Sequence, residues 1–475
     1  MGGEEKTSTR AFEEDITRGV SLLRGDPKTA IRKLSGPMIV AMLLLAVYNL
    51  ADAIWVAGLG ADELAAVGFV MPVFMVLIGL SNGLGAGATS VVSRRIGARD
   101  KDGADSAASH AILIGLAIAL VLTLPLTLNI RTIAEVLGAG SVAGLAAEYG
   151  SIVFLGTIFI FFVQISYAIL RSEGDTTRTM YAMGASSVLN IVLDPILIYG
   201  AGMGVAGAAA ATVISVATVS VVIYYWFNIR KDTFVTLSLR KLKPSRRVLS
   251  DILGVGLPAS IEYLLMSLIV IINNIILVAV AGTDAVAVYT SGWRIVMFAV
   301  VPLIGIGTSL VAVAGAAYGA REYRKLETAH RYSIRIGTGI AILTGIVTWI
   351  GAPWITMVFT YSPESAHLAA QFVLFFQTMC LFYPFVPAGM FSSSVFQGTG
   401  HGLTSLFITV LRNLLLIAVL AYLLGVVMGF GETGVYFGIV TGNIAGTLVG
   451  YIWARFFISR LVATESRIKN PHTGP

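Results

Sequence analysis

The chain has 475 residues, of which 56% are hydrophobic and only 12% are charged, about half the charged fraction of an average soluble domain. This composition, with a mean hydropathy of +0.84, excludes an ordinary soluble protein and indicates a chain that lies mostly within a membrane. The net charge of +6 does not indicate a nucleic-acid partner, because the basic residues lie in the loops between apolar segments. The single cysteine, Cys380, excludes an intramolecular disulfide and a cysteine-based metal site.

Apolar stretches recur from about Ile31 to about Phe457, and each is long enough to cross a hydrocarbon layer of roughly 30 Å. They predict an all-α membrane protein with about twelve transmembrane helices. The expected spans, in chain order, are residues 31–57, 65–92, 106–131, 143–170, 177–200, 203–228, 248–280, 285–315, 328–350, 365–395, 402–425 and 433–458.

The polar segments divide the chain into five parts. The first 30 residues have no apolar core, so we expect a cytosolic arm there rather than a signal peptide. The longest polar break separates the first six spans from the last six. The predicted parts are the arm (1–30), an amino-terminal lobe (31–228), a cytosolic linker (229–247), a carboxy-terminal lobe (248–458) and a cytosolic tail (459–475).

Basic residues gather in alternate loops. Arg94, Arg95, Arg99 and Lys101 follow the second span, and a larger basic group follows the sixth. The loops with the sequences GLGADE and AGTDA have no Lys or Arg. The positive-inside rule therefore predicts a multi-pass protein of the cell membrane with both termini in the cytoplasm.

The two halves repeat each other weakly. IGARD follows the second span and YGARE follows the eighth, so that Gly97 and Gly319 are 222 residues apart (319 − 97 = 222). The same offset brings Gly60 onto Gly282. Because each unit has an even number of spans, the duplication predicts two lobes related by an axis along the membrane normal. Two such lobes face a central cavity, and rocking them gives alternating access.

Two acids stand alone in the spans of the first lobe. Asp52 is the only charged residue within 34–61, and Asp194 is the only one within 179–229. A carboxylate at the centre of a spanning helix costs roughly 2.5 to 3.5 kcal/mol on insertion scales, so such residues usually have a function. Counted from the cytoplasmic side at 1.5 Å per residue, the two acids lie about 28 and 24 Å along their helices, in the outer half.

Other polar side chains are expected at the same depth. Asn190 is one helical turn before Asp194 on the same face. Thr212 and Tyr149 lie about two turns or fewer from the outer ends of their helices. Carboxylate, amide and hydroxyl oxygens suit a hard cation or a proton rather than zinc or copper. The sequence therefore predicts a site for an alkali ion or a proton in the first lobe.

The alternative is a purely architectural role for the two acids. The second lobe argues against it, since the offset of 222 places Asn274 opposite Asp52. The best alignment of the fifth helices pairs Asn190 with Asn413 and hence the second acid with Ile417. An architectural pair is easily kept in both lobes, so the asymmetry favours function.

Two prolines and three second-lobe charges complete the candidates. Pro37 lies inside the first helix and Pro195 follows the second acid, and each is expected to bend its helix by removing an amide donor. Glu262, Arg294 and Arg412 lie about ten to fifteen residues from helix ends, near mid-depth. We expect them to be buried, either as a charge-neutralising network or as a contact for substrate.

Several motifs carry a family resemblance. They are YNLADAIWVAGLGADELAAVG around the first acid, SRRIGARD after the second span, ILRSEGDTT after the fourth, and NIVLDPILI followed by GVAGAAAAT. On these motifs the chain resembles the multidrug and toxic compound extrusion family over nearly its whole apolar part. It is most similar to the branch named for DNA-damage-inducible F proteins.

The resemblance implies twelve helices in two lobes and antiport of organic cations against sodium or protons. It implies cation-binding roles for Asp52, Asn190, Asp194 and Thr212, which are then the candidate Na⁺ ligands, with Tyr149 nearby. It also implies that Pro37 lies at a bend of the first helix.

We therefore expect a secondary active multidrug efflux transporter rather than an enzyme. The chain has no GxxxxGK[ST] sequence for ATP and no nucleophile with a base. The alternative is a flippase for lipid-linked sugars or another amphipathic lipid of the same superfamily, which requires a basic cavity. The first lobe has no Arg or Lys in its spans, but Arg294 and Arg412 keep that alternative open. The expected partners are small organic substrates and membrane lipids, with no nucleic acid, no cofactor beyond Na⁺ or H⁺, and a monomeric state.

Overall fold

The computed structural model describes residues 16–237, 244–361, 363 and 365–469, and this part of the chain is helical without strands. The longer helices are α2 (Arg18–Arg24), α3 (Pro27–Ala57), α4 (Ala61–Gly97), α5 (Lys101–Val136), α6 (Ala143–Leu155), α7 (Thr157–Ser172), α8 (Thr176–Pro195), α9 (Gly204–Tyr224), α10 (Arg246–Gly319), α11 (Tyr323–Met357), α12 (Ala369–Met379), α13 (Val386–Gly398), α14 (Gly402–Val410), α15 (Val419–Tyr422) and α16 (Gly431–Lys469). Short 3₁₀ or π turns extend or join them: η1 (Gly140–Val142), η2 (Ile196–Gly200), η3 (Tyr225–Arg230), η5 (Ala366–Leu368), η6 (Cys380–Phe385), η7 (Leu411–Ala418) and η8 (Leu423–Val427).

The prediction of an all-α membrane protein is confirmed. Ten helical elements of the described chain are long and apolar enough to span a membrane, and η1–α6 with α7, bent by 49°, form an eleventh span. One of the ten, α10, has 74 residues and breaks at Gly282, where φ is 77°. Straight, it would extend roughly 110 Å, so it folds back as two spans. The described helices thus supply the twelve spans that the sequence predicts.

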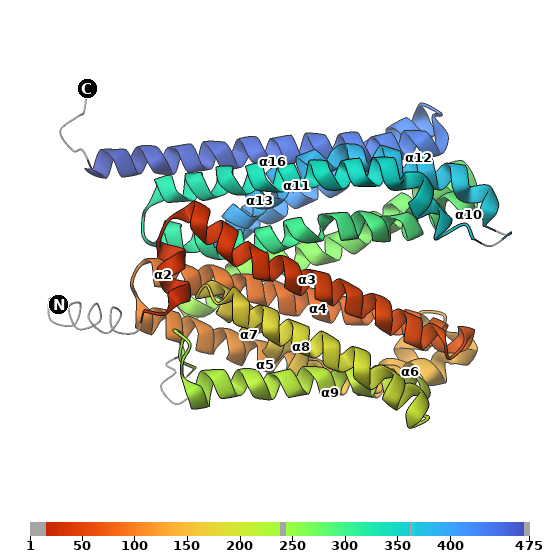
Figure 1. Ribbon diagram of the computed structural model, residues 1–475, viewed down its shortest axis with the longest axis horizontal. Coiled ribbons are helices and arrows are strands. Elements are labelled where there is room, and N and C mark those ends of the chain that lie inside the picture. The colour runs from red at the N-terminus through yellow and green to blue at the C-terminus, as the bar shows by residue number, and fades with distance from the viewer. Residues whose placement is uncertain (1–15, 238–243, 362, 364, 470–475) are drawn as a thin grey trace.

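The helices form two lobes (Figure 1). Helices α3 to α9 make the first lobe, and α10 to α16 make the second. Each lobe has its own large hydrophobic core. In Figure 1 the lobes lie together at the end that holds α2 and the carboxyl end of α16, and they spread apart toward the other end.

Helix α3 contributes to both cores. Before Pro37 its buried side chains pack in the core of the second lobe: Ala30, Ile31 and Leu34. After Pro37 they pack in the core of the first lobe: Met38, Ala41 and Val56. The helix continues through the proline, which lies where its packing changes from one lobe to the other.

The duplicated motif forms the seam between the lobes. A methyl group added at Gly97 would overlap the carbonyl oxygen of Ala316, and one added at Gly319 would overlap that of Arg94. The two contacts are related by the 222-residue offset of the sequence repeat, since 316 − 94 = 222 and 319 − 97 = 222. The Ser90 hydroxyl adds a buried hydrogen bond across the seam to a carbonyl of α13, at 3.2 Å. The repeat is therefore visible as a pseudo-symmetric crossing of α4 and α10.

The small residues of α4 allow it to pack closely against α10. A methyl group at Gly83 would meet Ser260 and Gly256, and one at Gly87 would meet the carbonyl oxygen of Ile252. The backbones of α4 and α10 approach closely at these glycines, as small residues permit in membrane helices.

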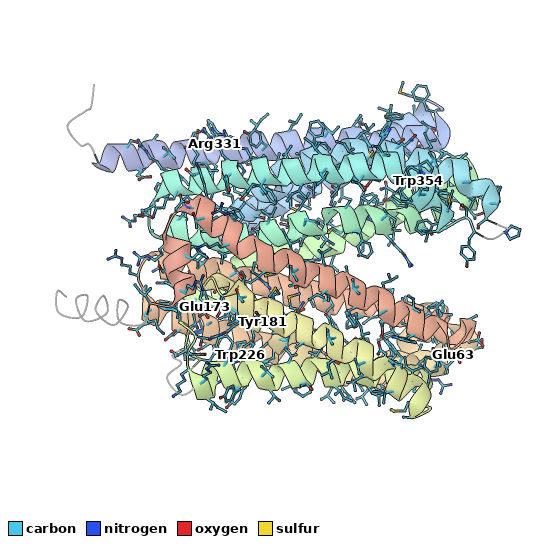
Figure 2. All side chains as sticks on the ribbon, viewed as in Figure 1. Glu63, Glu173, Tyr181, Trp226, Arg331 and Trp354 are labelled. Carbon is cyan, nitrogen blue, oxygen red and sulfur yellow. The ribbon has the colours of Figure 1, made fainter. Side chains whose placement is uncertain are left out.

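The polar segment after η3, residues 231–237, packs against the first lobe. Arg178 binds the Asp232 carboxylate at 2.8 Å, and the backbone N–H of Val235 donates to the buried Glu173 carboxylate at 2.8 Å. Figure 2 shows Glu173 near the end that holds α2, with Glu63 near the opposite end. Residues 238–243 of the expected linker and 1–15 of the expected arm lie outside the described residues, and residues 27–30 of that arm already belong to α3.

Candidate ion site in the first lobe

Helix α8 supplies one acid and an amide. The Asp175 carboxylate begins the helix by accepting the backbone N–H of Arg178 at 3.0 Å, which is an ordinary amino-terminal cap. One turn separates Asn190 from Asp194, so both side chains lie on the buried face. Asn190 is 2% exposed and Asp194 is fully buried. At Pro195 the α-helix gives way to the π-helical turn η2, so the acid lies at an irregular helix end.

The amide of Asn190 joins the acid to α9. The orientation that satisfies both of its ends has its nitrogen donating to Asp194 Oδ2 at 2.9 Å. Its oxygen then accepts from the hydroxyl of Thr212 at 3.2 Å and from the backbone N–H of Thr212 at 3.1 Å. Thr212 is 9% exposed, so the network is shielded from bulk solvent.

Helices α3 and α6 complete the site. Asp52 of α3 lies close enough to Asp194 for the two carboxylates to interact electrostatically, and Tyr149 of α6 interacts with both. The structure therefore brings together the five residues that the sequence placed at one depth. Tyr149 is 8% exposed and therefore buried on α6.

One residue of the site was missed from the sequence. Tyr48 of α3 interacts electrostatically with Asp52 and Asp194, and its hydroxyl lies near Thr212. It is four residues before Asp52, hence on the same helix face. The four-residue spacing that identified Asn190 beside Asp194 on α8 also identifies Tyr48 beside Asp52 on α3.

Two carboxylate oxygens of the site have no partner among the described groups. They are Oδ1 of Asp52 and Oδ1 of Asp194, and both atoms are enclosed. Buried polar atoms are nearly always hydrogen-bonded, so these two oxygens are free to accept a cation or a proton. Unpaired carboxylate oxygens beside an amide and hydroxyls suit a hard cation or a proton. The described residues contain no group of three His, Cys, Asp or Glu that could hold a metal ion.

The second-lobe charges are arranged differently from the prediction. Gln397 donates to the Glu262 carboxylate at 3.3 Å, and Arg412 interacts with Glu262 and donates to the Asn413 side-chain oxygen at 3.3 Å. Arg294 is exposed, so it is not the buried charge that was expected. Glu262 and Arg412, both half-buried, interact electrostatically without it.

Comparisons with known proteins agree with this architecture. The family model MatE matches residues 37–196 and 258–423, one match in each lobe. The multidrug export protein MepA of Staphylococcus saprophyticus is 28% identical over 439 residues, which cover 91% of this chain and 95% of that protein.

Solved structures match over nearly the whole chain. One, reported as the outward-facing conformation of a multidrug resistance MATE family transporter of the MOP superfamily, is 44% identical with a TM-score of 0.91, and covers 94% of this chain and 99% of its own. Another is a MOP superfamily transporter from Pyrococcus furiosus whose binding pocket is described as having reverse polarity, suggesting a different function. It is 43% identical with a TM-score of 0.90 and the same coverage. The chain therefore belongs to the MatE family, the multidrug and toxic compound extrusion transporters, whose members are membrane transporters and not enzymes.

Proposed function

We propose that this protein exports small, often cationic organic compounds across the cell membrane by antiport against Na⁺ or H⁺. The coupling ion binds in the first lobe, at Asp52, Asn190, Asp194 and Thr212, with Tyr48 and Tyr149 beside them. Export proceeds by alternating access, in which the two lobes open toward one side of the membrane at a time. Multidrug export by the MepA relative supports the substrate class.

The observation that carries the proposal is the pair of unpaired carboxylate oxygens. Asp194 is fully buried, yet its Oδ1 and the Oδ1 of Asp52 have no partner among the described groups. A buried polar atom without a partner costs about 1 to 3 kcal/mol, and a charged one costs more. A cation or a proton removes this cost when it binds. Binding therefore changes the electrostatic balance between α3 and α8, the helices that must respond in a coupled transporter.

The test is efflux by variants that remove one charge at a time. We expect Asp52→Asn and Asp194→Asn to abolish gradient-driven export of ethidium while the protein still reaches the membrane. Asp62→Asn is the matched control, because this acid of the same lobe lies exposed at the outer end of α4. Full ethidium export by both site variants would contradict the coupling role.

The coupling ion is identified by imposing the two gradients separately. Purified protein in liposomes is given either a sodium gradient or a pH gradient, and export is followed under each. The donor set suits both ions, so this assay, and not the geometry, separates them. Transfer of a lipid-linked sugar by the same liposomes, without ethidium export, would favour the flippase alternative.

Three finer assignments belong to the same proposal. The basic turns after α4 and η3 favour a cytoplasmic position for the end of the molecule that holds α2 and the carboxyl end of α16. The acids of the first lobe favour the branch named for DNA-damage-inducible F proteins. We also propose that one chain is the transporting unit, since each chain has both lobes and its own site.

A further inference from the structure

The short helix α2 lies between the two lobes at the end where they meet. Its seven residues begin at a cap in which the Thr17 hydroxyl accepts the backbone N–H of Val20 at 3.4 Å. Val20 is fully buried in the core of the first lobe, and Leu23 is 4% exposed in the core of the second. A single helical turn thus inserts one side chain into each lobe.

On the first lobe, α2 packs backbone to backbone against the turn between α7 and α8. A methyl group added at Gly19 would stand 2.5 Å from the Glu173 carbonyl oxygen and 2.8 Å from the carbonyl carbon of Gly174. Real side-chain carbons do not approach so closely. The position therefore accepts only glycine as long as α2 stays docked.

On the second lobe, α2 packs against the ends of α10 and α11. Leu23 lines a small gap together with Val313 and Ala316 of α10. The Lys325 ammonium group of α11 donates to the Arg24 carbonyl oxygen at 2.8 Å, which satisfies an acceptor at the carboxyl end of α2. These contacts lie beside the seam, because Ala316 is also the residue that Gly97 touches.

The same segment is joined directly to the helix that holds an acid of the ion site. Only Gly25 and Asp26 separate α2 from α3, and the Asp26 carboxylate caps α3 by accepting the backbone N–H of Thr29 at 2.9 Å. Helices shorter than about 12 residues are marginal on their own in water, so α2 depends on its docking to stay folded. Separation of the lobes at this end removes one of its two partners.

We propose that α2 is a clasp that holds the lobes together at this end and must be released before the transporter opens there. The inference rests on the alternating access of the proposed function. In this clasp Val20 and Leu23 are the two anchors. Gly19 allows the close approach to the first lobe, and Lys325 holds the carboxyl end of α2 on the second. The seam glycines let α4 and α10 pack closely at this end, whereas α2 adds a segment that packs into both lobes at once.

The test measures distances between the two lobes by double electron–electron resonance spectroscopy of paired spin labels. The single cysteine is replaced in a Cys380→Ala background. Labels at Ala98 and Ser459 report the end that holds α2, and labels at Ala61 and Thr283 report the opposite end; all four positions are exposed. Measurements are made in liposomes without substrate or ion gradient, so they do not depend on transport.

Three variants perturb the clasp from different sides. Gly19→Ala displaces α2 from the first lobe, Leu23→Ala removes its anchor in the second, and Lys325→Met removes the hydrogen bond from α11. In all three we expect the population with long distances between the labels at positions 98 and 459 to rise about tenfold, which corresponds to about 1.4 kcal/mol of docking free energy. Gly254→Ala is the matched control, because this helical glycine of α10 has no atom within 4 Å of its added methyl group. The control should match the wild type.

The Gly19 variant separates docking from helix propensity. Alanine favours a helix over glycine by roughly 1 kcal/mol, so a propensity effect would strengthen α2 and shorten the distances. Unchanged distances in all folded variants overturn the clasp, whatever efflux does. Lengthened distances in a protein that fails to export ethidium would leave the clasp standing and refute the proposed function instead.

Discussion

Removal of the Asn190 side chain is the sharpest test of the ion site. The amide is a group that contacts both an acid and a second helix, with bonds of 2.9 Å to Asp194 and of 3.2 and 3.1 Å to Thr212. In Asn190→Ala, Asp194 loses the amide that donates to its Oδ2, and the backbone of α8 is not otherwise changed. Both oxygens of a fully buried acid then have no partner among the described groups.

The size of the effect follows from that missing hydrogen bond. Leaving one buried acceptor unsatisfied costs about 1 to 3 kcal/mol, which corresponds to roughly a five- to 150-fold change in a binding constant. The sign depends on the coupling ion. Sodium loses an oxygen ligand as well as an ordered neighbour, so the half-saturating sodium concentration should rise. A proton gains, because it neutralises a carboxylate that has lost its donor, and half-saturation should occur at a lower proton concentration.

The assay is export of ethidium from liposomes as a function of sodium at fixed pH, and of pH at fixed sodium. Asn413→Ala is the matched control, since Asn413 is the second-lobe counterpart, is 5% exposed and accepts a hydrogen bond from Arg412. We expect the control to leave both half-saturation points unchanged. Equal shifts in the two variants, or no shift in Asn190→Ala, would refute the assignment of the ion to this site.

Two further predictions concern residues that surround the site and the seam. Tyr48→Phe removes the hydroxyl near Thr212 but keeps the ring. We expect a several-fold change in the concentration of coupling ion that half-saturates export, with normal protein levels. Tyr181→Phe is the control because Tyr181 is exposed on α8, and an identical response of both variants would exclude a role for Tyr48. Burial raises the pKa of Glu173 from 4.5 to about 8, so folding favours its protonated form and the wild type should lose thermal stability as pH rises from about 5 to 8. Glu173→Gln stays neutral, and its melting temperature should fall less over this range; parallel melting curves would contradict the prediction.

The sequence by itself determined the spans and their number, and it predicted one level for the acids. Lipid offers no hydrogen bonds to the backbone, so each crossing needs a continuous apolar helix, and such a stretch can be recognised in the sequence. The helical rise is constant, so counting residues places Asp52, Asn190 and Asp194 at one level. The duplicated glycines revealed the two lobes in the same way, because the repeat is a property of the chain.

Only the tertiary structure decided which helix faces meet. Depth says nothing about rotation around a helix axis, so it predicted neither the exposure of Arg294 nor the place of Tyr48 in the ion site. It also says nothing about which lobe a segment packs on, yet α3 changes lobe at Pro37 and α2 inserts side chains into both. These choices depend on side-chain packing between helices distant in sequence. Hydropathy separates apolar from aqueous surroundings, but it does not distinguish a side chain that faces lipid from one in the protein interior.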